Sequence, residues 1–330
     1  MSFDLKRKED QIMPKKVLCV INHDSNNKIS SAFSSDQVVC VKKREVTEEM
    51  LNEATAVVGN LSADKLNKMP NLNWLHTESA GVNQYIGKIS PEIQMTCSSG
   101  CYGHAISEHM IAGVFYFYKK LDFYVRNQKM RRWKNEGQVD SIEGATCLVV
   151  GLGDIGKSFA RKMKAMGCKI IGIKRNIHDK PEYVDELTTL DHLNELLPTA
   201  DIIAMCLPDT PNTKQVLSEN NLRLCKKNAV LINVGRGVNI DSTALVSVLD
   251  EGWFKGVQLD VVDPEPLPYN NKLWSYDNVL ITPHVSGNYN LPQTLERVLD
   301  LAIRNIDNYL NDKPLENLVS HTEGYRINND

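Results

Sequence analysis

Three residues in the second half of the chain, Arg236, Glu265 and His284, form a set suited to acid/base chemistry on an anionic substrate. Imidazole titrates near neutrality, so His284 is the candidate proton donor. Glu265 lies in a proline-stiffened loop and is the candidate carboxylate that orients the imidazole and keeps it protonated. Arg236 stands between two glycines, which we expect to expose its guanidinium for bidentate binding of a carboxylate. Taken singly, Arg236 is equally well explained as a cap on surface carbonyls and His284 as a structural histidine, so the prediction depends on the whole set.

Arg236 and His284 each follow an apolar run of the kind that forms a buried parallel strand, and Glu265 lies in the loop that follows another such run. Four such strand ends occur in succession, at Leu207-Pro208, Gly235-Arg236-Gly237, Asp260 and Pro283-His284. Ligands of open α/β sheets bind beyond the carboxyl ends of the strands. The four strand ends therefore predict one shared crevice.

A glycine-rich loop follows another apolar strand, Cys147–Val150, and reads Gly151-Leu-Gly-Asp-Ile-Gly156. In a dinucleotide-binding loop the first glycine permits the tight turn, the second lets a pyrophosphate approach the backbone, and the third lets the helix pack on its strand. The helix N-terminus then offers its N–H groups to the phosphates. Alone the pattern is weak evidence, but a helix over 155–166 and a strand over 169–173 complete a βαβ unit.

Short apolar runs alternate with helical patterns along the chain, which predicts α/β architecture with parallel sheets. The first series has expected strands at 17–21, 38–41, 56–59, 74–77 and 93–96 and helices at 48–54 and 63–69, without a glycine phosphate loop. The second series has six expected strands, at 147–150, 169–173, 201–206, 229–234, 256–260 and 278–281. An apolar helix over 105–118 precedes this series, and a helix over 291–310 follows it and is expected to pack back on the first unit.

We therefore expect two Rossmann-like or flavodoxin-like domains, with a doubly wound parallel-sheet cofactor domain inserted in the substrate domain. The expected boundaries are 1–100 and 292–330 for the substrate-binding (catalytic) domain and 101–291 for the dinucleotide-binding Rossmann domain. A cleft between the domains is the expected ligand site.

The composition is that of an ordinary soluble protein with a small-molecule partner. The 330 residues carry a formal net charge of -3 with both signs interspersed, so no nucleic-acid partner is expected. No stretch is apolar enough to span a membrane, and residues 1–11 lack the apolar segment of a signal peptide, so we expect a cytoplasmic protein. The eight cysteines are scattered without zinc-site spacing, which indicates buried reduced thiols and no metal.

Five segments together resemble the D-isomer-specific 2-hydroxyacid dehydrogenase family, in particular its glyoxylate/hydroxypyruvate reductase-like, NADP-type members. They are Gly151–Gly156, Leu207–Thr213, Asn228–Gly237, Leu259–Pro266 and Pro283–Gly287. The resemblance implies that His284 is the general acid/base, Glu265 its partner, and Arg236 the anchor for the substrate carboxylate and carbonyl. It also implies that Asp260 holds the nicotinamide carboxamide.

The same resemblance implies further contacts and a partner. Cofactor binding is expected at Gly151, Gly153, Asp154, Ile155, Gly156, Leu207, Pro208, Thr213, Val234, Gly235, Arg236, Asp260, His284 and Gly287. The loop 78–83 resembles the family's substrate loop, with the backbone amides of Ser79, Ala80 and Gly81 as carboxylate donors beside Arg236 and His284; from the residues alone it is a glycine turn after a strand. The helix over 103–120 resembles the family's pairing helix, so we expect a homodimer, although its apolar stripe is also explained as intrachain core.

One departure from the family's NAD-dependent members lies about 20 residues beyond the glycine loop. There an acid receives the ribose 2′-hydroxyl, whereas this chain has Lys174 and Arg175, followed by Asn176. A basic pair attracts the 2′-phosphate that a carboxylate repels, and Asn176 adds a hydrogen bond. Two basic residues in a loop are also typical of a solvated edge, but because of the position we favour NADP(H) over NAD(H).

The expected reaction is the NAD(P)H-dependent reduction of a 2-oxo acid to a D-2-hydroxy acid, with hydride transfer to the keto carbon and a proton from His284. Glyoxylate, hydroxypyruvate and larger 2-oxo acids share the carboxylate and carbonyl, so the substrate stays open. Two alternatives remain, a dehydrogenase-like nucleotide-sensing binding protein and a short phosphoglycerate dehydrogenase-like enzyme. A formate dehydrogenase is disfavoured, because that branch of the family has glutamine in the place of Glu265.

Overall fold

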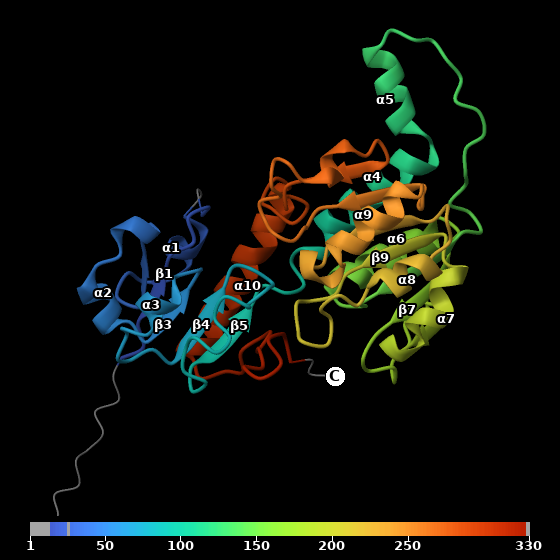
Figure 1. Ribbon diagram of the computed structural model, residues 1–330. Coiled ribbons are helices and arrows are strands. Elements are labelled where there is room, and N and C mark those ends of the chain that lie inside the picture. The colour runs from blue at the N-terminus through green and yellow to red at the C-terminus, as the bar shows by residue number, and fades with distance from the viewer. Residues whose placement is uncertain (1–13, 25–26, 328–330) are drawn as a thin grey trace, which may run out of the picture. The chain divides into compact units, whose positions relative to one another are not determined.

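The computed structural model describes residues 14–24 and 27–327, and the chain divides into two compact units (Figure 1). The first unit comprises Met1–Ser98 together with Val298–Asp330, and the second comprises Ser99–Arg297. The second unit is therefore inserted into the sequence of the first. Each unit has a sheet of its own, and the strands pair in parallel in both, which confirms the predicted fold class.

The first unit contains a five-stranded sheet in the order β2-β1-β3-β4-β5. Its strands are β1 (Val17–Cys19), β2 (Val38–Cys40), β3 (Ala56–Val58), β4 (Trp74–Thr77) and β5 (Gln94–Cys97), and its short helices are α1 (Lys28–Ala32), η1 (Lys43–Glu45), α2 (Glu48–Glu53) and α3 (Ala63–Leu66). This is the strand order of flavodoxin-like sheets. One face is covered by an apolar cluster that includes Leu18, Val57, Leu75 and Met95.

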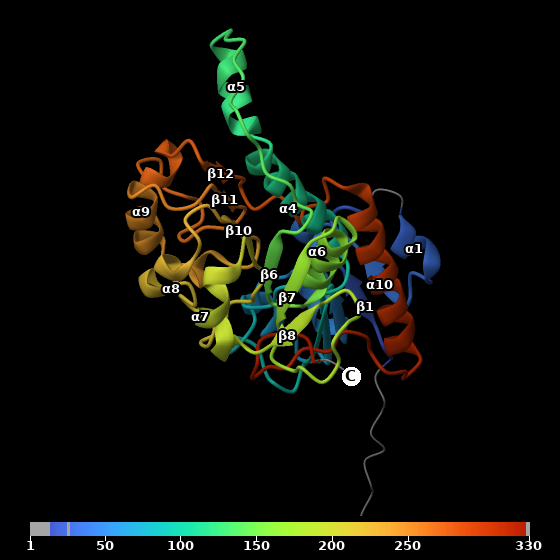
Figure 2. The same ribbon diagram turned by 90° about the vertical axis from the view of Figure 1, so that its right-hand side faces the viewer.

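The long helix α10 (Pro292–Leu310) returns to the first sheet, as its place in the sequence predicted. The ring of Tyr309 stacks on Trp74 of β4 with centroids 5.0 Å apart, and its hydroxyl donates a hydrogen bond to the Thr55 carbonyl. Val298 and Ala302 are buried one helical turn apart on the same helix. Figure 2 shows α10 alongside the strands of this unit.

The second unit contains a seven-stranded sheet in the order β12-β11-β10-β9-β6-β7-β8. Its strands are β6 (Thr146–Val150), β7 (Lys169–Ile173), β8 (Glu186–Thr188), β9 (Ile202–Met205), β10 (Val230–Asn233), β11 (Gly256–Leu259) and β12 (Val279–Ile281). Counted from β6, this is the Rossmann order with a seventh strand added. The order reverses between β6 and β9, and dinucleotides bind at such a reversal.

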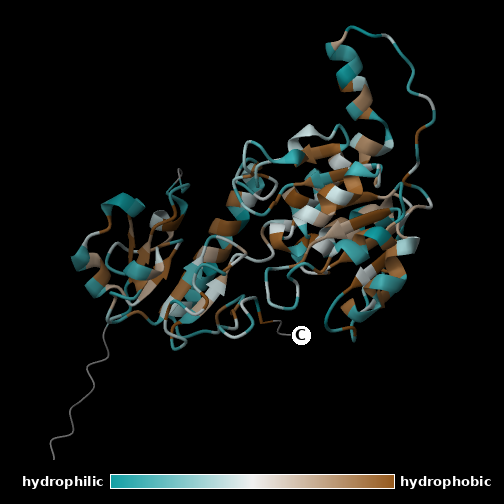
Figure 3. Cartoon of the chain, viewed as in Figure 1, coloured by the Kyte–Doolittle hydropathy of each residue, from teal (hydrophilic) through white to brown (hydrophobic). Residues whose placement is uncertain are grey.

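The second unit also contains helices, most of which connect its strands. They are α4 (Gly103–Tyr118), α5 (Leu121–Lys129), α6 (Asp154–Ala165), α7 (Leu193–Leu196), α8 (Glu219–Leu224), α9 (Ser242–Asp250) and the 3-10 turns η2 (Leu190–His192), η3 (Leu197–Thr199), η4 (Gly237–Asn239) and η5 (Lys272–Ser275). In Figure 3 the strands are mostly apolar, whereas polar residues lie along the helices. Throughout the described part of the chain, every helix is too short or too polar to cross a membrane.

The strand β8 is the one strand of this sheet that the sequence did not predict. Its three residues, Glu186–Thr188, include a single aliphatic side chain and are exposed or half-buried. An edge strand has a neighbour on one side only, so it needs no apolar run. Its register on β7 pairs Ile173 with Thr188.

Exposed apolar side chains gather on α5 and the segment after it, rather than on α4. Most of the expected apolar face of residues 103–120 is intrachain core, because Met110, Val114 and Phe117 are buried and α4 packs against α6. Figure 1 shows α5 projecting from the second unit. The exposed large apolar residues of this arm are Leu121, Phe123, Val125, Met130, Trp133 and Val139, of which Trp133 is completely exposed.

Candidate active site

The glycine loop after β6 has the geometry of a phosphate cradle. Gly151 has a φ of 104°, and a Cβ there would lie 2.8 Å from the Cys206 carbonyl oxygen. A Cβ on Gly156 would lie 1.9 Å from the Gly151 oxygen, so α6 can pack this closely only on glycine. A Cβ on Gly153 would meet no atom within 4 Å, which leaves open space beside the loop.

The N-terminus of α6 supplies hydrogen-bond donors to that space. Its first intrahelical bond runs from the Lys157 N–H to the Gly153 carbonyl at 2.9 Å, so the N–H groups of Asp154, Ile155 and Gly156 have no intrahelical partner. These donors and the helix dipole fit the pyrophosphate of a dinucleotide. The Asp154 carboxylate accepts the Gly103 N–H at 2.7 Å, so this side chain caps the start of α4.

The predicted specificity residues stand at the carboxyl end of β7, which neighbours β6 in the sheet. Lys174 is half-buried, whereas Arg175 and Asn176 are exposed. The Lys174 N–H donates to the Thr188 carbonyl at 3.0 Å, which ties the end of β7 to β8. The Asn176 side-chain oxygen accepts the His178 N–H at 3.1 Å. The strand end therefore presents basic side chains where an acid would receive a ribose 2′-hydroxyl.

The loop after β9 is held by its own threonine and by an asparagine from η4. Thr213 is buried, and its hydroxyl donates to the Pro208 carbonyl at 2.6 Å. The Asn239 amide donates to the Thr213 carbonyl at 2.9 Å and to the Pro208 carbonyl at 3.2 Å. Leu207 is half-buried and Pro208 exposed. Thr213 therefore shapes this loop, and its predicted contact with the cofactor stays a prediction.

Two asparagines that sequence reasoning missed join the strand-end loops. Asn239 accepts the Arg236 N–H at 2.9 Å. Asn233, at the end of β10, accepts the Gly235 N–H at 3.1 Å and donates to the Arg236 carbonyl at 2.9 Å. Both asparagines are buried. In the sequence, these two residues could have been noticed because Asn233 ends an apolar strand and Asn239 follows it by six residues.

The two glycines beside Arg236 serve close backbone packing, not the exposure of the arginine that the sequence suggested. A Cβ on Gly235 would lie 2.5 Å from the Leu207 carbonyl oxygen, and one on Gly237 would lie 2.0 Å from that of Val262. Arg236 is itself partly buried, and its Nη1 donates to the Gly235 carbonyl at 2.7 Å. The loops after β9, β10 and β11 therefore approach one another around this side chain.

The electrostatics of Arg236 reflect that position. Burial lowers the pKa of Arg236 from its ordinary value, and the negative charges of Glu265 and Asp209 oppose this shift. A guanidinium keeps its charge in proteins and has five N–H donors, of which the bond to Gly235 uses one. A partly buried cation with donors in reserve suits a carboxylate or a polarised carbonyl.

The structure brings His284 and Glu265 together. His284 Nδ1 lies 2.9 Å from Glu265 Oε2, and Glu265 Oε1 accepts the Val262 N–H at 3.1 Å. The His284 backbone lies in the left-handed region with a φ of 52°, and its N–H donates to the Asp260 carbonyl at 2.8 Å and to the Thr282 carbonyl at 2.9 Å. Because Nδ1 faces a carboxylate, Nε2 is the ring nitrogen that remains for a substrate.

Asp260 organises the segment that carries His284. Its buried carboxylate accepts the Thr282 hydroxyl at 2.6 Å, the Val285 N–H at 3.0 Å, the Ser286 N–H at 3.1 Å and the Ser286 hydroxyl. These four hydrogen bonds, from three residues to one carboxylate, hold this turn in place. The carboxamide contact that the resemblance implied for Asp260 stays a prediction.

Val234 and Gly287, two further predicted cofactor residues, have packing roles. Val234 is buried, and its N–H donates to the Met205 carbonyl at 3.1 Å. A Cβ on Gly287 would lie 3.0 Å from Cδ1 of Ile106 on α4. Packing within the second unit therefore accounts for a valine at position 234 and a glycine at position 287.

In the first unit, the loop after β4 carries Ser79, Ala80 and Gly81. The Thr77 hydroxyl donates to the Ser79 carbonyl at 2.9 Å, and the Ser79 hydroxyl donates to the Gly81 carbonyl at 2.7 Å. Within the described ranges, no backbone carbonyl accepts a hydrogen bond from the N–H groups of Ser79, Ala80 or Gly81. Three adjacent amide donors on an ordered loop suit a carboxylate.

The strand before this loop is anchored by His76, which is a structural histidine. Its Nδ1 lies 2.8 Å from the Thr96 hydroxyl, and its Nε2 lies 3.4 Å from that of Ser98. Burial lowers the pKa of His76 to about 3, so the ring is neutral near pH 7. His76 therefore belongs to the packing of β4 on β5.

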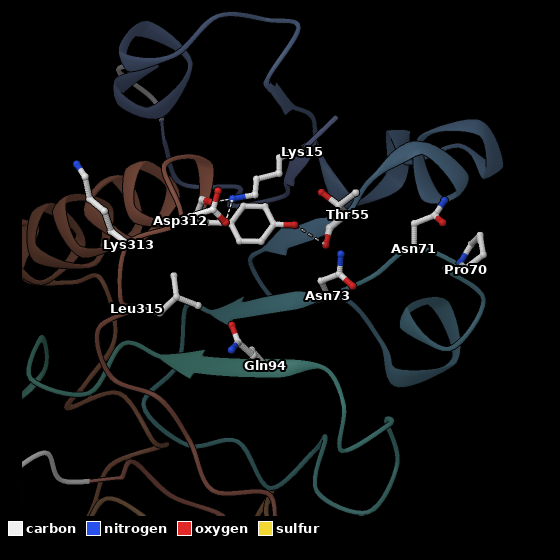
Figure 4. Close-up of a pocket in the computed structure, with 10 residues that line it drawn as sticks. Lys15, Thr55, Pro70, Asn71, Asn73, Gln94, Asp312, Lys313 and Leu315 are labelled. Carbon is white, nitrogen blue, oxygen red and sulfur yellow. Dashed lines mark hydrogen bonds and ion pairs between the residues drawn. The ribbon is translucent and has the colours of Figure 1, made fainter. Parts of the chain in front are cut away.

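A cavity of about 670 Å³ lies at the amino ends of the strands of the first unit (Figure 4). Lys15 and Thr55 line it just before β1 and β3, and Asn73 just before β4. Lys15 Nζ donates to the Tyr309 carbonyl at 2.6 Å and pairs with Asp312. None of the predicted site residues lines this cavity, because they follow the carboxyl ends of their strands.

The part of the chain that matches a family model lies within the second unit. Residues 111–286 match the family model for the D-isomer specific 2-hydroxyacid dehydrogenase, NAD binding domain. A glyoxylate reductase of Thermococcus kodakarensis is 36% identical over 181 residues, which are 54% of this chain and 53% of that protein. The match thus spans about half the length of this relative.

Solved structures resemble the chain over nearly its whole length. A D-isomer specific 2-hydroxyacid dehydrogenase family protein from Aeromonas salmonicida is 27% identical with a TM-score of 0.83, and the match covers 93% of this chain and 99% of that one. A probable 2-hydroxyacid dehydrogenase from Rhizobium etli, in complex with NADP, is 25% identical with a TM-score of 0.80 over 94% of this chain and 100% of that one.

Proposed function

The chain belongs to the D-isomer specific 2-hydroxyacid dehydrogenase family, and on that premise we propose that it reduces a 2-oxo acid to a D-2-hydroxy acid with NADP(H) as the preferred cofactor. The observation that carries the proposal is the pair formed by His284 Nδ1 and Glu265 Oε2 at 2.9 Å. A histidine oriented by a carboxylate, at the carboxyl edge of a parallel sheet with a glycine-rich phosphate loop, can donate the proton that carbonyl reduction needs.

His284 is the proposed proton donor, through Nε2. Glu265 holds the ring by Nδ1 and stabilises the imidazolium that must be present before the proton leaves. Arg236 binds the substrate and stabilises the negative charge that develops on the carbonyl oxygen during reduction. When bound, the nicotinamide supplies the hydride for the carbonyl carbon.

Asp260 is the proposed positioning residue of this site. Its carboxylate accepts hydrogen bonds from Thr282, Val285 and Ser286, on both sides of His284. Asp260 thereby fixes the turn that carries the imidazole. In the first unit, the N–H groups of Ser79, Ala80 and Gly81 are the proposed donors to a substrate carboxylate.

The preference for NADP(H) rests on the end of β7. Lys174 and Arg175 stand where an NAD-dependent enzyme has an acid. A ribose 2′-phosphate pairs with these cations, while a 2′-hydroxyl finds no carboxylate at this position. The NADP bound by the Rhizobium etli protein is consistent with this proposal.

One experiment tests activity, cofactor and substrate class together. The loss of NADPH or NADH absorbance is followed in parallel with glyoxylate, hydroxypyruvate, pyruvate and 3-phosphohydroxypyruvate. We expect glyoxylate or hydroxypyruvate to give the highest kcat/KM, at least tenfold higher with NADPH. Tight NADPH binding without turnover of any of these acids would favour a nucleotide-sensing protein, and a preference for NADH would overturn the argument from Arg175.

A homodimer is the proposed assembly, with α5 and its following segment as the contact surface. The side chains of Phe123, Met130 and Trp133 are all exposed, and apolar side chains exposed together are typical of a protein–protein contact. Sedimentation of the purified protein should give twice the chain mass of 37.2 kDa. Trp133→Ser with Phe123→Ser should shift the equilibrium toward monomer, and an unchanged dimer would place the contact elsewhere.

A further inference from the structure

Two cysteines of the first unit stand directly beside each other, on strands that carry none of the residues proposed for catalysis. Cys19 ends β1 and Cys40 ends β2, and the parallel register pairs their Cα atoms. Register partners on adjacent strands direct their side chains to the same face of the sheet. Both are free thiols.

The two thiols differ in access and in acidity. Cys40 is exposed on the edge strand, whereas Cys19 is buried one strand inside. A hydrogen bond between the side chains, with Cys19 as donor, lowers the pKa of Cys40 and raises that of Cys19. Partial burial of Cys40 and the nearby charge of Asp24 oppose the first shift. The arrangement therefore pairs an accessible, more acidic thiol with a protected, less acidic one.

In contrast to Cys40, several other cysteines have thiols that burial makes less acidic than usual. Burial raises the pKa of Cys206 and of Cys225 to about 12 and that of Cys168 to about 11. Cys147 is completely buried in β6. Cys40 is exposed and Cys206 is half-buried, whereas the other six cysteines are buried, so the expectation of buried thiols is wrong for Cys40.

We propose that Cys19 and Cys40 form a redox-active dithiol site, which a hydroperoxide oxidises to a disulfide and a dithiol restores. The Cys40 thiolate attacks the outer peroxide oxygen, the O–O bond breaks, and Cys40 becomes a sulfenic acid while hydrogen peroxide is reduced to water. The Cys19 sulfur then attacks the Cys40 sulfur, the S–O bond breaks, and a second water leaves with the Cys19 proton. Two electrons pass from the two thiols to the peroxide.

The backbone geometry suits the bond that this reaction forms. Neighbouring strands lie about 4.8 Å apart, and disulfides span Cα separations of about 4.4 to 6.8 Å. The register of Cys19 and Cys40 therefore needs no shift of β1 against β2. Cys40 is exposed on the edge strand, so a hydroperoxide in the solvent can reach its sulfur.

The test is mass spectrometry of the full chain after brief treatment with hydrogen peroxide. Trypsin cleaves after Lys28, so Cys19 and Cys40 fall on different peptides. We expect these two peptides to be joined, with the loss of two hydrogens, and to separate with dithiothreitol. Iodoacetamide should alkylate Cys40 at least tenfold faster than Cys225 in the untreated protein.

Two variants decide whether the reaction has the proposed order. Cys19→Ser should leave Cys40 as a sulfenic acid that dimedone traps, and Cys40→Ser should leave Cys19 reduced. Because Cys19 is buried, Cys19→Ala serves as a second version if the serine variant unfolds. A peroxide-treated wild type without the joined peptides, or Cys40 alkylation no faster than that of Cys225, would overturn the proposal.

Discussion

Replacing His284 with asparagine is the sharpest test of the proposed acid/base site. His284 has a φ of 52°, and asparagine tolerates this left-handed backbone better than most other side chains. The side chain is 49% exposed, so its loss leaves no cavity in the core. An amide can still donate to Glu265, but it does not transfer a proton near neutral pH. We therefore expect the variant to fold and to bind NADPH while it loses turnover.

The expected loss of turnover follows from the role of His284 as a general acid. A positioned general acid contributes about 100- to 10,000-fold in rate. At about 1.4 kcal/mol per tenfold change, the loss is about 3 to 6 kcal/mol of transition-state stabilisation. The unfolding free energy should change by less than about 1 kcal/mol, because the contact removed is a solvent-exposed pair.

The assay is the rate of NADPH oxidation at saturating glyoxylate or hydroxypyruvate, with NADPH affinity measured separately by its fluorescence. Glu265→Gln is the matched control, because it keeps a hydrogen bond to His284 and removes the charge. It should retain more activity than His284→Asn. A folded His284→Asn variant with kcat within tenfold of the wild type would refute the assignment of His284 as the acid.

Four further substitutions test other parts of the structure. Arg175→Ala should raise the KM for NADPH at least tenfold in steady-state assays and leave that for NADH unchanged. Gly153→Ala should weaken NADPH binding measured by fluorescence but hold the melting temperature, because its Cβ enters open space. Gly237→Ala should destabilise the fold by about 1 to 3 kcal/mol in urea titrations, because its Cβ would overlap the Val262 carbonyl. His76 has a pKa of about 3 in the folded state, so the unfolded chain alone gains a proton there as the pH falls through 6.5. Stability should therefore fall by about 1.4 kcal/mol between pH 8 and 5.5 in urea titrations, and His76→Gln should remove this part of the loss.

Much of the fold was predictable from local patterns. Buried parallel strands are apolar on both faces, so β6, β9 and β10 are recognisable as short runs of aliphatic residues. The edge strand β8 was not recognisable, because half-exposed residues carry no such run. The arm at α5 was also missed, since its exposed apolar residues do not differ in sequence from those of a buried helix.

The sequence was sufficient to nominate the residues of the candidate site, but not to predict the contacts between them. Polar residues after apolar strands pointed to Arg236, Glu265 and His284, because parallel strands end at one edge. The glycines around Arg236 looked like a means of exposure, yet they permit the approach of Leu207 and Val262 from other loops. Such contacts join residues far apart in the chain, and no local pattern encodes them.

By itself, the sequence determined the class of fold, the glycine-rich loop at Gly151 and the residue types available for chemistry. These depend on short-range properties, namely apolar periodicity, glycine spacing and the identity of each side chain. Only the tertiary structure decided that His284 faces Glu265, that Asp260 holds the turn that carries His284, and that Cys19 lies beside Cys40. Those relations depend on strand order and register, which arise when segments distant in sequence bury their surfaces together.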